Sequence, residues 1–471
     1  MASEAKCIDL LLVNPPMCSD RSGRPTAPEK IGINCGVMPP TQLLKLATVL
    51  QKHGITAKVI DLALFAARND VLLLFDELLS KSKVQKVGFS NHTVINLDVI
   101  AKLARLAKRH GAEVIVGGIN ATHMQGEIFQ YVPDADVVFV GFAEKTLLDY
   151  IVGGKISKGV LTKENALIPR SPADLAKNNS DARESLELVN EAVKPDLNLL
   201  LFLEEYVKAG CIYPIETQRG CEFSCNFCVS KMLLGGSPLR REIEGVIKEM
   251  KTALQAGFTE FFFTDNTLTG DKSYISQLCH RMIEEDICYK TKNVLAMTRV
   301  DAVDPSLLAL LAESGFTGLG FGVETAGKVQ ELGKGIAQQQ HISATKAAFS
   351  AARQYGIEPT AFLMVGSPID TEETLSATLE FCKEGISQGW LAKGFATISK
   401  FIPVPGSIYY YWPEKFGIRK LTRENFANAW FFCGSPVTAT RYLSVERIAW
   451  WHDKLRQELQ CETIPQFELM G

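Results

Sequence analysis

Three cysteines, Cys221, Cys225 and Cys228, form a C-x3-C-x2-C pattern directly after Gln218-Arg219-Gly220. Cysteine thiolates are the usual ligands of iron–sulfur clusters, and ferredoxin-type runs of closely spaced cysteines take further ligands from elsewhere in the chain. Here the next cysteine is Cys279, so none lies within the following fifty residues. The pattern therefore predicts a four-iron four-sulfur (4Fe-4S) cluster held by three thiolates, with one iron open to a small molecule.

Two other interpretations of these cysteines are open. They could form a zinc site with a histidine as fourth ligand, but His123 and His280 are both distant in the sequence. They could also be buried structural thiols, although three at this spacing are not typical of a core. The spacing favours the cluster, and the structural context of the loop is the test of that prediction.

The length and composition of the chain are typical of a globular protein of two or three domains. It has 471 residues, a formal net charge of −3 and 46% hydrophobic residues, values that are ordinary for a folded protein and leave room for sizeable cores. The small negative charge gives no electrostatic reason to expect a nucleic-acid partner. Twelve cysteines in so long a chain are not a disulfide framework, and they favour a reducing, cytoplasmic location.

The apolar runs of the chain, such as Leu10–Val13 and Val71–Phe75, are too short to span a bilayer. The first residues show no charged-then-apolar signal pattern. We therefore expect no membrane partner.

Short apolar segments alternate with amphipathic ones over residues 6–150. This alternation predicts a doubly wound parallel sheet with helices on its faces. The expected strands are Ile8–Val13, Val59–Leu62, Val87–Ser90, Val114–Val116 and Val137–Val140, and the expected helices are Thr41–His53 and Leu97–His110.

In such sheets a ligand binds beyond the carboxyl ends of the strands. Glycines at these ends let a large ligand approach the backbone. A dinucleotide is disfavoured, because no G-x-G-x-x-G follows the first strand. The candidate binding residues at the strand ends are Asn14, Pro15, Ser90, Asn91, His92, Gly117, Gly118, Asn120, Gly141 and Glu144.

The alternation of apolar and amphipathic segments stops over residues 151–205, and the polar stretch Ser171–Lys194 is typical of an interdomain linker. Six further strand-like segments then alternate with helices through residues 206–410, which predicts a partial, TIM-like (β/α)6 barrel. These strands are Ile212–Thr217, Glu260–Thr264, Val294–Thr298, Gly318–Gly322, Thr360–Val365 and Ala396–Ile402, and the helices are Glu242–Ala256, Tyr274–Glu285, Pro305–Ser314, His341–Tyr355 and Thr371–Gln388.

Residues 411–471 are expected to form a helical cap. The C-terminal part of the chain is rich in aromatic residues, at Tyr409-Tyr410-Tyr411-Trp412, Trp430-Phe431-Phe432 and Trp450-Trp451. We expect these rings to pack across the open barrel; the alternative is that some of them line the mouth of a substrate site.

The cysteine spacing, with Phe227 just before the third cysteine, resembles the signature of the radical S-adenosylmethionine (radical SAM) family. In that family SAM chelates the open iron and is cleaved reductively to a 5′-deoxyadenosyl radical. The resemblance implies SAM-binding roles for Phe227 and for residues at successive strand ends, namely Asp265, Arg299, Glu324 and Gly366.

The resemblance implies a separate role for each strand end. Asp265 would accept from the SAM amino group, or instead cap the following helix. Arg299 would bind the SAM carboxylate, or instead pair with Asp301 or Glu324. Glu324 would accept from the ribose hydroxyls. Gly366 begins a Gly-Ser-Pro-Ile-Asp-Thr run similar to the family segment that cradles adenine.

The first sheet resembles the cobalamin-binding domain that precedes many radical SAM modules. Asn120 stands where that family frequently has a histidine, and Phe142-Ala143-Glu144 replaces a more glycine-rich turn. The D-x-H-x-x-G motif that supplies a lower cobalt ligand is absent. The lower face of the cobalt would then be left open or be covered by Asn91 or His92. Alternatively, His92 only lines or caps the strand end.

Together the two resemblances imply a cobalamin-dependent radical SAM methyltransferase. Its cofactors would be a 4Fe-4S cluster, SAM and cobalamin as methylcobalamin, and it would methylate an unactivated carbon of a small molecule or of a peptide or protein side chain. Its electron donor would be a flavodoxin or a ferredoxin. No catalytic acid or base is identified. The alternatives are a radical cyclase, oxidase or rearrangement enzyme without net methylation, and a non-catalytic corrinoid or cluster carrier.

Overall fold

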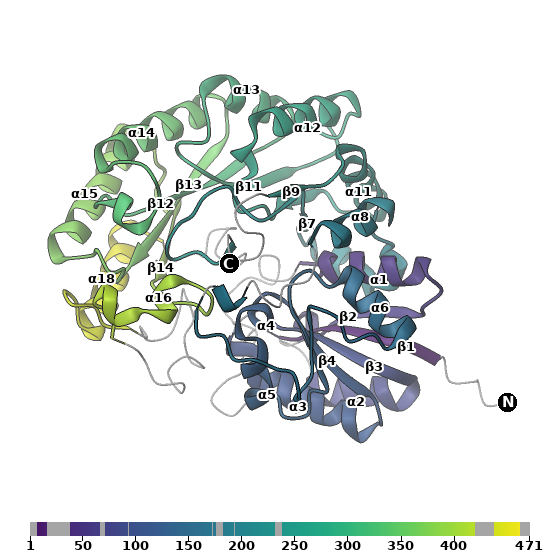
Figure 1. The fold of residues 1–471 in the computed structure, drawn as a ribbon. Coiled ribbons are helices and arrows are strands. Elements are labelled where there is room, and N and C mark those ends of the chain that lie inside the picture. Colours follow the sequence, from purple (N-terminus) through teal and green to yellow (C-terminus); the bar gives the residue numbers. More distant parts are fainter. Residues whose placement is uncertain are drawn as a thin grey trace. The chain divides into compact units, whose positions relative to one another are not determined.

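The structure is a computed structural model that describes residues 7–16, 38–65, 71–92, 94–171, 173–175, 182–192, 194–230, 238–419 and 438–461. The chain divides into two compact units, Met1–Cys211 and Ile212–Gly471. Figure 1 labels most of their helices and strands.

The first unit contains a six-stranded sheet in the order β2-β1-β3-β4-β5-β6. The first five of these strands are parallel, and β6 pairs with β5 in the antiparallel sense. β2 lies on one side of β1 and the following strands lie on the other, so the direction in which strands are added reverses at β1. Doubly wound sheets bind ligands at such a switch point. The strands are β1 Cys7–Asn14, β2 Ala57–Asp61, β3 Lys83–Ser90, β4 Glu113–Gly117, β5 Val137–Phe139 and β6 Val160–Leu161.

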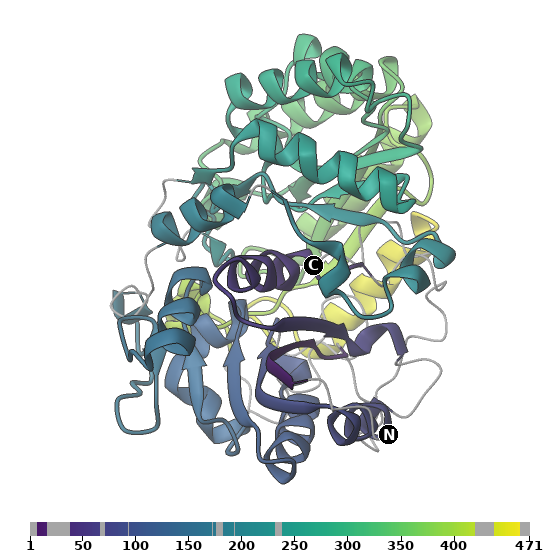
Figure 2. The same ribbon diagram turned by 90° about the vertical axis from the view of Figure 1, so that its right-hand side faces the viewer.

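Helices cover both faces of this sheet, with α1 and α6 on one face and α2 and α3 on the other (Figures 1 and 2). The parallel, doubly wound fold predicted from the sequence is confirmed. Buried aliphatic residues from β1, β3 and α3 form the core of the face that carries α2 and α3. The helices are α1 Thr41–Lys52, α2 Val71–Lys81, α3 Leu97–Arg109, α4 Ile119–Met124, α5 Ile128–Tyr131 and α6 Glu144–Gly153.

The segment expected to be a linker carries a helix that the sequence analysis did not predict, α8 (Ala182–Ala192). Val189 and Ala192 of this helix pack against Val49 of α1, and Ser185 Oγ donates to the carbonyl of Phe142 at 3.0 Å. The short helix α9 (Leu203–Ala209) follows. The described part of residues 151–205 thus belongs to the first unit, and the four-part domain division stays a prediction.

The second unit contains a six-stranded, fully parallel sheet in the order β14-β13-β12-β11-β10-β7. Helices α11 to α15 lie along one side of it (Figure 1), which confirms the partial barrel. The strands are β7 Tyr213–Ile215, β10 Glu260–Phe263, β11 Asn293–Arg299, β12 Gly318–Glu324, β13 Glu358–Val365 and β14 Ala396–Lys400, and the helices are α11 Ile243–Ala256, α12 Lys272–Glu284, α13 Pro305–Glu313, α14 Gln338–Gln354 and α15 Glu372–Gln388.

The C-terminal region is helical, with α16 (Ile408–Tyr411), η7 (Pro413–Phe416) and α18 (Val445–Glu458). Tyr409 is buried in an apolar cluster with Leu332, Met364, Phe401 and Ile418, and Trp451 Nε1 donates to Glu372 on α15 at 2.8 Å. Packing therefore accounts for these two rings. Trp430, Phe431 and Phe432 lie outside the described residues.

No helix in the described parts of the chain has both the length and the apolar character needed to cross a membrane.

Candidate active site

The cysteine loop begins after a two-residue strand, β8 (Gln218–Arg219), which pairs with β9 (Leu239–Arg240). Cys221 is buried, with its sulfur 3.7 Å from Thr267 Oγ1. The Cys228 amide donates to the carbonyl of Cys225 at 3.1 Å, so that the loop turns tightly between these two ligands. Burial raises the pKa of the Cys225 thiol to about 11, and the cations of Lys334 and Arg299 act in the opposite direction.

The donor set of this loop fits an iron–sulfur cluster. No three ligand-type side chains among the described residues converge on a position for a single metal ion, but a four-iron cluster does not require this, because each thiolate binds its own iron. The Arg299 guanidinium lies 3.6 Å from Cys225 Sγ. A cation at that distance favours the thiolate form that iron needs.

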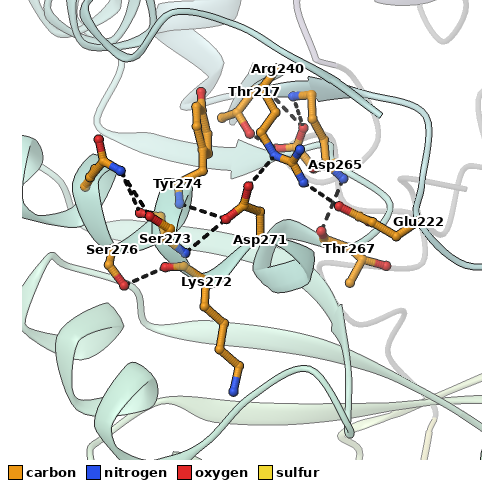
Figure 3. Close-up of polar contacts among 12 residues, drawn as sticks. Thr217, Glu222, Arg240, Asp265, Thr267, Asp271, Lys272, Ser273, Tyr274 and Ser276 are labelled. Atoms are coloured by element: carbon orange, nitrogen blue, oxygen red, sulfur yellow. Dashed lines mark hydrogen bonds and ion pairs between the residues drawn. The ribbon is translucent and has the colours of Figure 1, made fainter. Parts of the chain in front are cut away.

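A charged network holds the loop from one side (Figure 3). Glu222, the neighbour of Cys221, accepts from Arg240 NH2 at 2.5 Å, and Arg240 Nε lies 3.5 Å from Asp271 Oδ2. Asp271 caps α12 by accepting from the amides of Ser273 and Tyr274. This network could not be predicted from the sequence, because residues so far apart in the chain leave no periodic signal.

Asp265, at the end of β10, anchors the backbone before the cysteine loop. Its carboxylate accepts from the amides of Thr217 and Gln218 at 3.0 and 2.6 Å and from the Thr217 hydroxyl at 3.0 Å (Figure 3). Burial raises the pKa of Asp265 to about 6, although these hydrogen bonds act to lower it. The alternative that Asp265 caps the following helix is wrong, since Asp271 does so. Its contact with the SAM amino group stays a prediction.

Arg299 lies at the end of β11 and is held on several sides. Its guanidinium donates to Asp301 at 2.8 and 2.6 Å and to the carbonyl of Lys334 at 2.8 Å. It also lies over the Phe223 ring, 3.9 Å from the centroid. The ion pair with Asp301, given above as the alternative to a SAM-binding role, is confirmed, and it fixes the plane of a guanidinium beside Cys225. The contact of Arg299 with the SAM carboxylate stays a prediction.

Glu324 ends β12 in a left-handed conformation with φ of 63°. The pairing of β12 with β13 is irregular between Gly322 and Glu324. Lys334 Nζ donates to Glu324 Oε1 at 2.8 Å and to the carbonyl of Gly322 at 2.5 Å. The Lys334 side chain is only 2% exposed. Lys334 belongs to no motif, so its role at this site could not be predicted from the sequence.

Gly366 follows β13 with φ of 88°. A Cβ atom there would lie 2.9 Å from Ile448 of α18, so both the conformation and the packing require glycine. Asp370 accepts from the amides of Gly366 and Ser367 at 2.9 and 2.8 Å. Phe227 packs against the apolar cluster that contains Tyr409.

In the first unit the ends of β3 and β4 are joined by side-chain amides. Asn120 Nδ2 donates to Asn91 Oδ1 at 2.7 Å, and Asn91 Nδ2 donates to Asn96 Oδ1 at 2.5 Å. Gly118 has φ of 104°, and a Cβ atom there would lie 2.6 Å from the Asn91 carbonyl oxygen. Glycine is therefore required for the two strand ends to approach each other.

The remaining predicted residues of this unit lie at the same edge of its sheet. Asn14 Nδ2 donates to Asp61 at 2.9 Å, and His92 Nε2 lies 3.0 Å from Ser90 Oγ, which agrees with the interpretation that His92 lines a strand end. The Gly141 amide donates to Thr122 Oγ1 at 3.0 Å. Pro15 follows β1, Gly117 ends β4, and Glu144 is the buried first residue of α6.

These strand ends fit a large polar ligand such as cobalamin. Asn14 Oδ1 and Asn96 Nδ2 are both buried and have no hydrogen-bond partner in the described parts of the chain. Buried amide atoms without partners are uncommon. A ligand rich in amide groups would supply such partners.

Comparisons with known proteins agree with this arrangement. Residues 35–151 match the model of the B12 binding domain, and residues 215–382 match that of the Radical SAM superfamily. The chain is 28% identical over 385 residues to the "Uncharacterized methyltransferase PH0819" of Pyrococcus horikoshii, covering 78% of this chain and 77% of that protein. It is 22% identical to the bacteriochlorophyllide d C-12(1)-methyltransferase of Chlorobaculum tepidum, covering 64% of this chain and 60% of that protein.

The fold is similar to that of the radical S-adenosylmethionine methyltransferase TsrM from Kitasatospora setae, solved with cobalamin and a [4Fe-4S] cluster bound. The TM-score is 0.69 at 17% identity, and the match covers 98% of this chain and 92% of that one.

The fold and the site define a radical SAM protein with an N-terminal cobalamin-binding domain. More narrowly, this order of a B12 binding domain before a Radical SAM domain, together with relatives named as methyltransferases, is similar to that of cobalamin-dependent radical SAM methyltransferases.

Proposed function

We propose that this enzyme methylates an unactivated carbon atom of a small molecule or of a peptide or protein side chain. The observation that carries the proposal is the arrangement around the cysteine loop, where Cys225, Arg299 and the Lys334–Glu324 pair lie close together in a chain that also has a B12 binding domain. Relatives named as methyltransferases, one of them a bacteriochlorophyllide d C-12(1)-methyltransferase by its name, support it.

Each group of residues has a defined task in this proposal. Cys221, Cys225 and Cys228 would hold the cluster, and the strand-end residues of the first unit would hold cobalamin. When bound, these cofactors would supply the reductive cleavage of SAM and the methyl group for transfer. Arg299, fixed by Asp301, would bind the SAM carboxylate, and Glu324 would accept from the ribose hydroxyls. The electron would come from a donor such as a flavodoxin or a ferredoxin.

The test is anaerobic reconstitution with iron, sulfide and methylcobalamin, followed by SAM and a low-potential reductant. We expect corrinoid absorbance to remain after desalting and 5′-deoxyadenosine to appear by mass spectrometry. In Cys225→Ala we expect deoxyadenosine to fall to background, because the cluster loses one of three ligands. Cys7→Ala is the matched control, because Cys7 is an exposed, free thiol at the start of β1.

Deoxyadenosine without retained corrinoid would assign the first unit another role and count against methyl transfer from cobalamin. An intact cluster that binds SAM and never cleaves it, with candidate substrates present, would contradict the enzyme and favour a carrier. Once deoxyadenosine is seen, a screen of small molecules and peptides for a mass gain of one methyl group identifies the substrate class.

A further inference from the structure

The segment 331–335, between β12 and α14, lies directly on the cysteine loop. The Asn226 amide donates to the carbonyl of Leu332 at 2.8 Å, and Asn226 Nδ2 donates to that of Glu331 at 3.3 Å. Gly333 has φ of 78°, and a Cβ atom there would lie 2.7 Å from Asn226 Oδ1 and 3.0 Å from the carbonyl of Ser224. The segment therefore contacts the residues on both sides of Cys225.

Lys334 connects this segment to the two strand ends beside it. Its carbonyl accepts from Arg299 NH2 at 2.8 Å, while its ammonium group donates to Glu324 Oε1 at 2.8 Å. Arg299 in turn lies 3.6 Å from Cys225 Sγ. Lys334 thus contacts two of the three charged side chains for which SAM-binding roles are predicted, Arg299 and Glu324, and it lies in a segment that also contacts the neighbours of Cys225.

The ion pair between Lys334 and Glu324 is held in one geometry by its burial and by the backbone conformation of Glu324. The side chains of Lys334 and Glu324 are 2% and 14% exposed, and a buried ion pair requires good geometry to offset desolvation. Glu324 is a non-glycine residue with positive φ, a conformation that persists only where the surroundings impose it, as they often do at functional sites. Lys334 occupies Oε1, and no described residue is hydrogen-bonded to Oε2.

We propose that Lys334 is a positioning residue that fixes Glu324 and Arg299 relative to Cys225, so that SAM meets a preformed site. Its ammonium group also adds positive charge beside the cluster. The inference rests on the proposed function, because it assumes that SAM binds at these strand ends.

The test uses the full-length, reconstituted protein with Lys334→Met, which keeps the length of the side chain and removes its charge. We expect the Kd for SAM, from equilibrium dialysis, to rise by roughly tenfold or more, as is usual when a residue that orients a ligand group is lost. The midpoint potential of the cluster, followed by EPR, should become more negative, because a nearby cation stabilises the reduced, more negative cluster. Lys328→Met is the matched control, because the Lys328 side chain is exposed and makes a loose ion pair with Glu331, with 3.9 Å between Nζ and Oε1.

A second variant separates positioning from folding of the loop. In Lys334→Met combined with Glu324→Gln, no charge remains buried alone, so iron content should match the wild type while the Kd for SAM stays raised. Wild-type SAM affinity and potential in iron-replete Lys334→Met would overturn the proposal and leave the enzyme's proposed function intact. Failure of the paired variant to hold iron would also overturn it, because Lys334 would then serve only the fold. Wild-type protein that holds iron and binds no SAM would instead contradict the proposed function.

Discussion

The strand ends of the two units use different interactions to hold their backbones in place. In the first unit Asn91, Asn96 and Asn120 exchange neutral amide hydrogen bonds, and Gly118 allows close backbone contact. In the second unit charged pairs take this role, namely Arg299–Asp301 and the largely buried pair Lys334–Glu324. Neutral hydrogen bonds and open backbone suit a large ligand of many amides, whereas fixed charges suit a compact zwitterion and an anionic cluster.

This contrast has an energetic side that mutations can measure. A neutral hydrogen bond contributes about 1 kcal/mol net, whereas removing one partner of a buried ion pair costs about 3–5 kcal/mol. The second unit should therefore be the more sensitive to changes of charge, and the first unit to changes of shape.

The largest effect on stability is expected at the buried pair formed by Arg241, directly after β9, and Glu249 on α11. Arg241 NH1 donates to Glu249 Oε2 at 2.5 Å and to the carbonyl of Glu216 at 2.8 Å, and the side chains of the pair are 1% and 0% exposed. Arg241→Met leaves a buried carboxylate without its cation, so we expect a loss of about 3–5 kcal/mol in the free energy of unfolding. Chemical denaturation measures it.

The control is Lys81→Met, which breaks an exposed ion pair with Glu77 on α2 and should leave the denaturation midpoint unchanged. An equally small effect at Arg241 would mean that charges in the second unit are no more critical than those on the surface.

The charge network is also the part that could not be predicted from the sequence. The strand over Ile8–Val13 and the helix over Leu97–His110 were predicted to within one residue of β1 and α3, because hydrophobic periodicity is a local signal. The cysteine loop and the strand ends were found from spacing and order. Lys334 was missed, because the partner of Glu324 is set by tertiary contacts and not by a pattern in the neighbouring residues.

A smaller effect, dependent on pH, is expected at Asp265. Burial raises its pKa from 3.8 to about 6 in the folded protein. A raised pKa means that the native state holds the proton more tightly, so this group's contribution to stability is full below pH 4 and is lost as the pH rises through about 6. Asp265→Asn removes the titration, and its amide can still accept from Thr217 and Gln218 through one oxygen. We therefore expect the variant to gain stability relative to the wild type between pH 4 and 7, by at most about 3 kcal/mol.

Thermal denaturation of both proteins across that pH range makes the comparison, and it uses stability alone, with no cofactor required. A constant difference between the two at every pH would show that Asp265 does not titrate in this window. A gain by the wild type as the pH rises would show that its hydrogen bonds outweigh the cost of burying its charge.

The smallest effect is expected from crowding the strand ends of the first unit with an added side chain. Two glycines allow this effect on stability to be isolated. Gly118 and Gly54 both have positive φ, at 104° and 80°, but a Cβ atom at Gly118 would meet the Asn91 backbone at 2.6 Å whereas one at Gly54 meets nothing within 4 Å. Alanine adds backbone strain at both positions, so the difference between the two variants reports the crowding alone. We expect Gly118→Ala to cost about 1–3 kcal/mol more than Gly54→Ala and to reduce the corrinoid retained after desalting, which Gly54→Ala should leave unchanged. Equal losses of stability and equal corrinoid retention would mean that the close approach of β3 and β4 has no part in forming the ligand site, and the contrast between a unit organised by shape and one organised by charge would then fail.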